Sequence, residues 1–182
     1  MNPSLTWLDV ARVSVGYALA LVALFTLVVI GALLVARDAL LSDYPPAIRE
    51  RYGGQSARGR QTAAVAGLLN LLLFVAVPVA GVLDLHGRVD GRLGFLPPFA
   101  LGATGFLALT LFDLLVIDWL LFCTVRPRFM TLPGTEGMPE YRDLAFHAKV
   151  LVPRPVPWPL LAIPGYGVAV GGIAWLAETL TG

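Results

Sequence analysis

Four apolar stretches, separated by polar connections, dominate the pattern of this chain. They cover roughly residues 13–36, 62–83, 97–123 and 158–180. A helix needs about 20 apolar residues to cross the hydrocarbon core of a bilayer, so each stretch is long enough to span it. We therefore predict an all-α, polytopic membrane protein in which four transmembrane helices form a single domain over residues 1–182.

The composition agrees with this prediction. Hydrophobic residues make up 57% of the chain and charged residues only 14%, far from the balance of a soluble domain. The tryptophans, Trp7, Trp119, Trp158 and Trp175, fall near the ends of the apolar stretches, as expected for side chains that favour membrane interfaces. The first stretch is too long for the core of a signal peptide and lacks a basic leader, so we expect it to remain as a membrane anchor.

The basic residues predict the orientation. The connection 37–61 holds Arg37, Arg49, Arg51, Arg58 and Arg60, and the connection 124–157 holds Arg126, Arg128, Arg142, Lys149 and Arg154. Because basic residues are retained on the cytoplasmic side, we expect both connections to be cytoplasmic and both termini to lie outside. The strong preference for Arg over Lys is associated with a bacterial source, which makes the membrane a bacterial plasma membrane. With a net charge of +1 and no basic tail, nothing indicates a nucleic-acid partner.

Two aspartates lie inside the third apolar stretch, in the run LTLFDLLVIDWLLFC from Leu109 to Cys123. A charge near the centre of a bilayer costs at least roughly 2.5–3.5 kcal/mol, so Asp113 and Asp118 should face the protein interior or a wet cavity and find partners there. At about 100° per residue on an α-helix, the two side chains should point about 140° apart and not form a pair. Asn70 should lie at the depth of Asp113, and it is the predicted partner of that carboxyl group.

The second cytoplasmic connection carries the other concentration of polar side chains. From Glu140 to Val152, apolar residues recur at helical spacing, which predicts a short amphipathic helix at the inner membrane interface. Asp143 and His147 are four residues apart and should form an exposed pair on this helix. No second histidine or cysteine stands at ligand spacing, so we predict no metal site and no cofactor.

The same connection contains candidates for binding a phosphate head group, from an anionic lipid or a nucleotide-linked substrate. They are Arg126, Arg128, Glu136, Asp143, His147 and Lys149, around a turn rich in glycine. Arginine side chains at the inner surface favour phosphate, although the positive-inside rule explains the same residues without a ligand. No nucleotide-binding or serine-hydrolase motif accompanies them.

Prolines and glycines predict how the helices pack. Pro78 and Pro164 should kink or loosen the second and fourth helices. Gly167 and Gly171 have the GxxxG spacing, which lets helix backbones approach closely. We expect this face to pack within the chain, while a homo-oligomer contact and a cavity wall remain alternatives.

Four motifs together resemble a group of bacterial four-helix integral membrane proteins. They are DYPPAIRERY at 43–52, FDLLVIDWLLFCTVRPRF at 112–129, LPGTEG at 132–137 and YRDLAFHAK at 141–149. The resemblance extends over most of the chain and implies the same fold and membrane location. It implies no activity, cofactor or site residue.

Three functions fit this pattern. The one that the sequence favours is a non-enzymatic scaffold or accessory subunit, in which Asn70, Asp113 and the glycines serve packing. The second is a protein or enzyme that binds the head group of a lipid or isoprenoid. The third is a subunit of an ion- or proton-coupled transporter that uses Asp113 and Asp118. The expected partners are the bilayer with its anionic head groups, a second copy of the chain or another membrane protein; whether the protein is an enzyme stays open.

Overall fold

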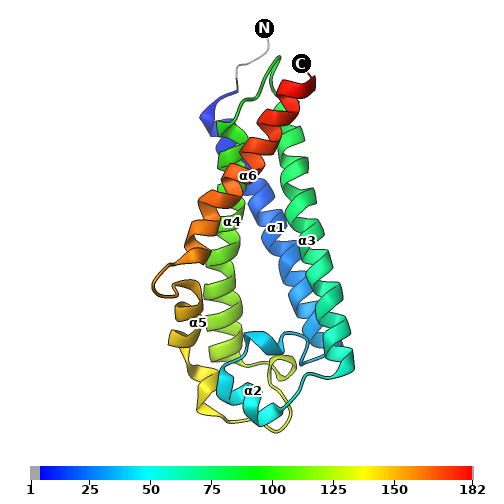
Figure 1. Cartoon of the computed structure of the whole chain (residues 1–182), viewed down its shortest axis with the longest axis vertical. Helices are drawn as coiled ribbons and strands as arrows, with labels where there is room; N and C mark the ends of the chain where they lie inside the picture. The colour runs from blue at the N-terminus through cyan, green and yellow to red at the C-terminus, as the bar shows by residue number, and fades with distance from the viewer. Residues whose placement is uncertain (1–4, 182) are drawn as a thin grey trace. The chain divides into compact units, whose positions relative to one another are not determined.

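The computed structural model describes residues 5–181, and the all-α prediction is confirmed. Four helices are long and apolar enough to cross a bilayer. They are α1 (Trp7–Val35), α3 (Ala57–His86), the continuous helix made of α4 (Leu96–Phe112) and η2 (Asp113–Val125), and α6 (Trp158–Thr181) (Figure 1). The chain is therefore a multi-pass membrane protein with the predicted number and order of spanning helices.

The helices extend beyond the apolar stretches that predicted them. α1 begins at Trp7 rather than near residue 13, because Thr6 and Asp9 form a capping box. The N–H of Asp9 donates to the hydroxyl of Thr6 at 3.2 Å, and the N–H of Thr6 donates to the carboxylate of Asp9 at 3.2 Å. Helical hydrogen bonding continues where polar side chains begin, so hydropathy marks the apolar part of a helix and not its ends.

The described residues pack in two compact units, which we treat separately. Unit 1 comprises residues 1–24, 73–111 and 152–182, and unit 2 comprises residues 25–72 and 112–151. The division falls within α1 and α3 and at the junction of α4 with η2, so three of the spanning helices contribute residues to both units. α6 belongs to unit 1.

Glycines allow close packing of α4 and α6 in unit 1. A Cβ atom at Gly167 would lie 2.9 Å from the carbonyl oxygen of Phe99, and one at Gly171 would lie 2.8 Å from that of Phe95. Both distances are too short for any side chain. The GxxxG residues therefore serve packing within the chain, as we expected.

Pro78 interrupts the hydrogen bonding of α3, and α6 repairs it. A proline has no N–H, so the carbonyl oxygen of Phe74, four residues earlier, loses its helical partner. The hydroxyl of Tyr166 donates a hydrogen bond to this oxygen. The rings of Phe74, Phe106 and Tyr166 pack against one another around it. The freed carbonyl is thereby satisfied in a region without water.

The connection between α3 and α4 is fastened to α6 by Glu178, which the sequence analysis did not single out. Its carboxylate accepts hydrogen bonds from the N–H groups of Leu93 at 2.8 Å and Gly94 at 3.1 Å. It also lies 3.4 Å from Nδ1 of His86. The connection is therefore held in place at the end of α6.

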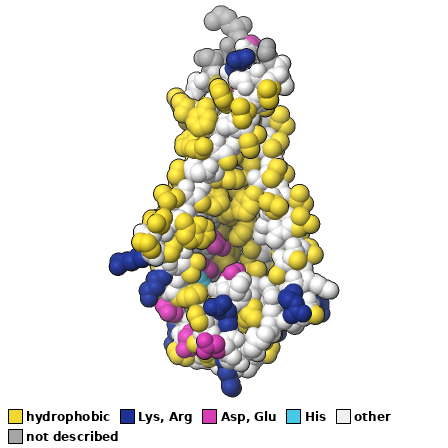
Figure 2. Space-filling view, in the orientation of Figure 1, with side chains coloured by type: hydrophobic (Ala, Val, Ile, Leu, Met, Phe, Trp, Pro, Cys, Tyr) yellow, Lys and Arg dark blue, Asp and Glu magenta, His cyan; other side chains and the backbone are white. Residues whose placement is uncertain are grey.

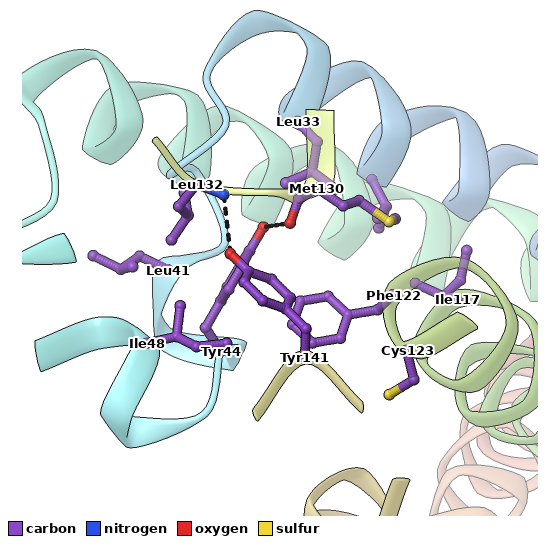
Figure 3. Close-up of a cluster of buried hydrophobic side chains, with 11 residues drawn as sticks. Leu33, Leu41, Tyr44, Ile48, Ile117, Phe122, Cys123, Met130, Leu132 and Tyr141 are labelled. Carbon is purple, nitrogen blue, oxygen red and sulfur yellow. Dashed lines mark hydrogen bonds between the residues drawn. The ribbon is translucent and has the colours of Figure 1, made fainter. Parts of the chain in front are cut away.

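Unit 2 is built around the two basic connections. The first contains η1 (Leu41–Asp43) and α2 (Pro46–Tyr52), and the second contains η3 (Arg128–Met130), η4 (Pro139–Arg142) and α5 (Leu144–Leu151). Both contribute to one buried cluster with α1 and η2, made of Val29, Leu33, Leu41, Tyr44, Ile48, Ile117, Phe122, Cys123, Met130, Leu132 and Tyr141 (Figure 3). The two connections thus fold together as one layer.

Hydroxyl groups form one hydrogen bond between the two connections and two within the second connection inside this cluster. The hydroxyl of Tyr44 donates to the carbonyl of Met130 at 2.9 Å, and the N–H of Leu132 donates to the hydroxyl of Tyr141 at 3.0 Å (Figure 3). The hydroxyls of Thr135 and Tyr141 are 2.7 Å apart. The buried hydroxyls of Tyr44, Thr135 and Tyr141 therefore each have a hydrogen-bond partner, which offsets the cost of desolvating them.

Asp38 fastens the first connection to the start of α3. Its carboxylate accepts a 2.6 Å hydrogen bond from the N–H of Ser56, and the hydroxyl of Ser56 accepts one of 2.9 Å from the N–H of Gly59. A Cβ at Gly59 would lie 2.5 Å from Oδ1 of Asp38, so any other residue here would force the carboxylate of Asp38 to move. Desolvation raises the pKa of Asp38, but the hydrogen bonds from Ser56 outweigh it and leave the pKa below its usual value.

Candidate functional site

Unit 2 contains a cavity of about 460 Å³. Its polar lining residues are Ser42, Asp43, Tyr44, Asn70, Asp113, Asp118 and His147. Its apolar lining residues are Phe25, Val29, Leu33, Leu40, Ile117, Phe122, Met130, Phe146 and Val150. Figure 2 shows acidic side chains and a histidine side chain inside a hollow on one face of the molecule. The cavity therefore combines an apolar wall with a small set of ionisable groups, as small-molecule sites do.

The geometry of η2 brings both intramembrane aspartates to this cavity. η2 is a π-helix, in which an N–H donates to the carbonyl five residues earlier; the N–H of Arg126 donates in this way to Leu121 at 2.7 Å. Residues five apart therefore lie about one turn apart on the same side of the helix. The predicted angle of about 140° assumed α-helical geometry, whereas in the π-helix both side chains line the same cavity.

His147 belongs to the cavity and not to an exposed pair on α5. Its side chain is 7% exposed, and its Nδ1 lies 3.2 Å from Oδ2 of Asp118. Its ring packs edge-on against Phe122 and Phe146. The carboxylate of Asp118, on η2, thus orients the imidazole of His147. Nε2 is the ring nitrogen that points away from this carboxylate.

The predicted pair between Asp143 and His147 was wrong, because the helix begins later than expected. α5 starts at Leu144, after the short 3₁₀ turn of η4, rather than at Glu140. Asp143 precedes it as a cap, and its carboxylate accepts a 3.0 Å hydrogen bond from the N–H of Phe146. An aspartate in this position satisfies a free N–H at the helix start.

Two polar atoms of the cavity wall are unsatisfied in the described part of the chain. Oδ1 of Asn70 and Nε2 of His147 are buried and make no hydrogen bond. A buried polar group without a partner costs about 1–3 kcal/mol. We expected Asn70 to pair with Asp113. Both residues line the cavity, but the amide oxygen of Asn70 accepts no hydrogen bond. The desolvation of these two polar atoms of the wall is therefore uncompensated within the described residues.

Asp43 is the third carboxylate of the cavity, and the sequence analysis did not identify it as a site residue. It ends η1, and the hydroxyl of Ser42 donates to its Oδ1 at 3.0 Å. Although it is exposed to the space of the cavity, the surrounding walls limit its hydration. This desolvation, followed by the charge of Asp118, raises the pKa of Asp43 despite the opposing bond from Ser42. An aspartate before Tyr-Pro-Pro in a polar connection resembles an ordinary turn residue, so no sequence pattern distinguishes Asp43 as a site residue.

α5 forms one wall of the cavity through Phe146, His147 and Val150. Besides the contact of His147 with Asp118, a hydrogen bond from Nε1 of Trp119 to the carbonyl of Leu144 at 3.2 Å holds the start of α5 against η2. Trp119, predicted only as an interface residue, therefore also positions this wall.

The predicted head-group residues do not gather at the cavity. Of Arg126, Arg128, Glu136, Asp143, His147 and Lys149, His147 alone lines it. Glu136 accepts a 2.8 Å hydrogen bond from the N–H of Gly134 and so closes its own turn. Arg126 ends η2 with a left-handed backbone, at φ 52°. The cavity lining consequently contains aspartate and histidine but neither lysine nor arginine.

The ionisable groups surround the cavity without meeting at one point. Among residues 5–181, no three or more His, Cys, Asp or Glu side chains are grouped closely enough to hold a metal ion. Carboxylates spread over several walls suit a ligand larger than a metal ion, held by charge on one side and by apolar contact on another.

Comparison of the chain with protein-family models, curated proteins and solved structures found no match.

Proposed function

We propose that the protein binds a hydrophobic organic cation in the cavity of unit 2, as part of an ion- or proton-coupled transporter. The observation that carries this proposal is the lining of the cavity. Asp43, Asp113 and Asp118 stand among aromatic and aliphatic side chains, with His147 as the one lining residue that can carry a positive charge.

Charge favours a cation as the occupant. A carboxylate in a poorly hydrated space is costly unless an opposite charge accompanies it. His147 can accompany Asp118 at 3.2 Å, which leaves the other two carboxylates without a basic partner in the lining. A positively charged ligand supplies the missing charge.

The size and the apolar walls favour an organic ion over a small inorganic one. A volume of about 460 Å³ lies in the range of about 300–1,000 Å³ that small-molecule sites occupy. The rings of Phe25, Phe122 and Phe146 line the cavity, and aromatic rings attract cations that have lost part of their hydration. Transport is the favoured activity because Asp113 and Asp118 lie in a membrane-spanning helix.

The proposal accounts for features that a purely structural role leaves unexplained. A scaffold gains nothing from unsatisfied polar atoms on Asn70 and His147, or from an acidic cavity. A phosphate head group, the second candidate from the sequence, would be repelled by the carboxylates of this cavity. We assign anionic head groups instead to basic residues outside the lining, such as Arg128 and Lys149.

We also propose that the membrane is a bacterial plasma membrane, with unit 2 on the cytoplasmic side and both termini outside. Most of the basic residues lie in the ranges of unit 2, which supports this orientation through the positive-inside rule. The bacterial assignment rests on the resemblance of the sequence motifs to bacterial four-helix membrane proteins.

The binding of tetraphenylphosphonium to the purified full-length protein, in nanodiscs of neutral lipid, tests the proposal. We expect Asp118→Asn and Asp43→Asn each to weaken binding tenfold or more. Glu50→Gln is the matched control, since Glu50 is an exposed acid of unit 2 outside the cavity lining. Equal affinity in all four proteins would contradict the assignment of the cavity.

A further inference from the structure

We infer that protons and the organic cation compete for the carboxylates of the cavity, so that each cation bound displaces protons into solution. This inference rests on the proposed function. If protons and the cation exchange at this site, a proton gradient can drive movement of the cation.

The first step is the charge of the empty cavity. If Asp43, Asp113 and Asp118 were all ionised and His147 were protonated, the lining would carry two negative charges in excess. Carboxyl groups that share a space of low polarity cannot all remain ionised. We therefore infer that some of them bind protons while the cavity is empty.

The second step is that, within residues 5–181, no other element contributes a basic side chain to the lining of the cavity. α1 contributes apolar side chains to the lining, and α3 contributes the neutral amide of Asn70. Tyr44 is a neutral donor whose hydroxyl is bonded to the carbonyl of Met130. Arg49 of α2 acts on Asp43 but does not line the cavity, and its influence is smaller than that of desolvation.

The third step is the exchange itself. A bound cation stabilises the ionised form of the carboxylates around it, so a carboxylic acid releases its proton to water as the cation arrives. One monovalent cation replaces about one proton, and the net charge of the site is conserved.

Isothermal titration of tetraphenylphosphonium into the nanodisc-embedded protein tests this inference. The titration is run in phosphate and in Tris at the same pH, because the two buffers differ in their heat of protonation. We expect the observed heats to differ by the amount that corresponds to release of about one proton per cation. We also expect the affinity for tetraphenylphosphonium to rise several-fold, up to tenfold, for each unit of increasing pH. This holds over the pH range in which carboxyl groups of the empty cavity bind protons.

Equal heats in both buffers, together with an affinity that does not change with pH, would overturn the inference while leaving the proposed function intact. Absence of tetraphenylphosphonium binding would overturn the proposed function and the inference with it. The Asp43→Asn variant adds a further criterion: it should release fewer protons per cation, and an unchanged number would contradict the role of Asp43. The buffer comparison needs only the wild-type protein, so poor folding of a variant does not weaken the test.

Discussion

Asp38 and Asp43 belong to the same connection of unit 2, but their carboxylates have opposite relations to stability. Asp38 is buried and accepts a hydrogen bond from the N–H of Ser56, which holds its pKa below the usual value. Asp43 faces the cavity, and desolvation raises its pKa. The ionised carboxylate of Asp38 therefore stabilises the fold, whereas that of Asp43 destabilises it. We assign Asp43 to ligand binding instead.

The Asp38→Asn substitution should lower the free energy of unfolding by about 1–3 kcal/mol at pH 7, the typical cost of weakening a charged, buried hydrogen bond. A group with a depressed folded pKa contributes stability above its unfolded pKa, near 3.8 for aspartate, and loses it as the pH falls through the folded value. Thermal unfolding of both proteins in mild detergent at pH 7 and below pH 4 measures this. Equal stability at pH 7 would contradict the role of Asp38.

The Asp43→Asn substitution should have the opposite effect and stabilise the protein at pH 7–8. A group with a raised folded pKa loses stability as the pH rises from its unfolded pKa through the folded value, so the wild type carries a penalty at neutral pH that asparagine lacks. The gain should vanish near pH 4. The same unfolding experiment checks this, and a loss of stability at pH 7–8 would show that the charge of Asp43 serves the fold.

At the scale of elements, the sequence indicates the prolines that interrupt helical hydrogen bonding but not the π-helix. Pro78 in α3 was visible as a helix breaker, whereas its repair by the hydroxyl of Tyr166 depends on a helix far along the chain. The π-helical geometry of η2 has no sequence signature of its own. An assumed 100° per residue therefore does not apply between Asp113 and Asp118. The contact of Asp118 with His147 was not predicted.

The Tyr166→Phe substitution should lower stability by about 0.5–2 kcal/mol, since it leaves the carbonyl of Phe74 unsatisfied inside the membrane. Adding Pro78→Ala should recover most of this loss, because alanine restores the N–H that the carbonyl lacks. Unfolding of the two single variants and the double variant in detergent measures the coupling. Strictly additive effects would contradict the proposed repair.

At the scale of the whole molecule, hydropathy was sufficient to predict the all-α class and the four spanning helices, since each helix must bury its backbone polar groups in lipid. It did not predict that the two basic connections form a common buried cluster, in which residues such as Ile48 and Leu132 are fully buried. That cluster joins segments about 80 residues apart, such as Tyr44 and Met130, and local periodicity carries no information about such pairs. The composition of the cavity depends on the same long-range packing.

The orientation can be tested with single cysteines in a Cys123→Ala background. A membrane-impermeant maleimide should label Arg92→Cys, in the connection between α3 and α4, on intact cells. It should label Glu50→Cys of unit 2 only after the membrane is opened, because we propose from the positive-inside rule that unit 2 is cytoplasmic. Both positions are exposed in the structure. Labelling of Glu50→Cys on intact cells would reverse the orientation.

On the proposed function, the cavity of unit 2 selects positive charge. The most direct measurement compares the affinities of the wild-type protein for tetraphenylphosphonium and for tetraphenylborate, two ions of nearly the same size and shape but opposite charge. With three aspartates in the lining and no lysine or arginine, we predict saturable binding of the cation and at least a hundredfold weaker binding of the anion. Equal binding of both ions, or preference for the anion, would contradict the account.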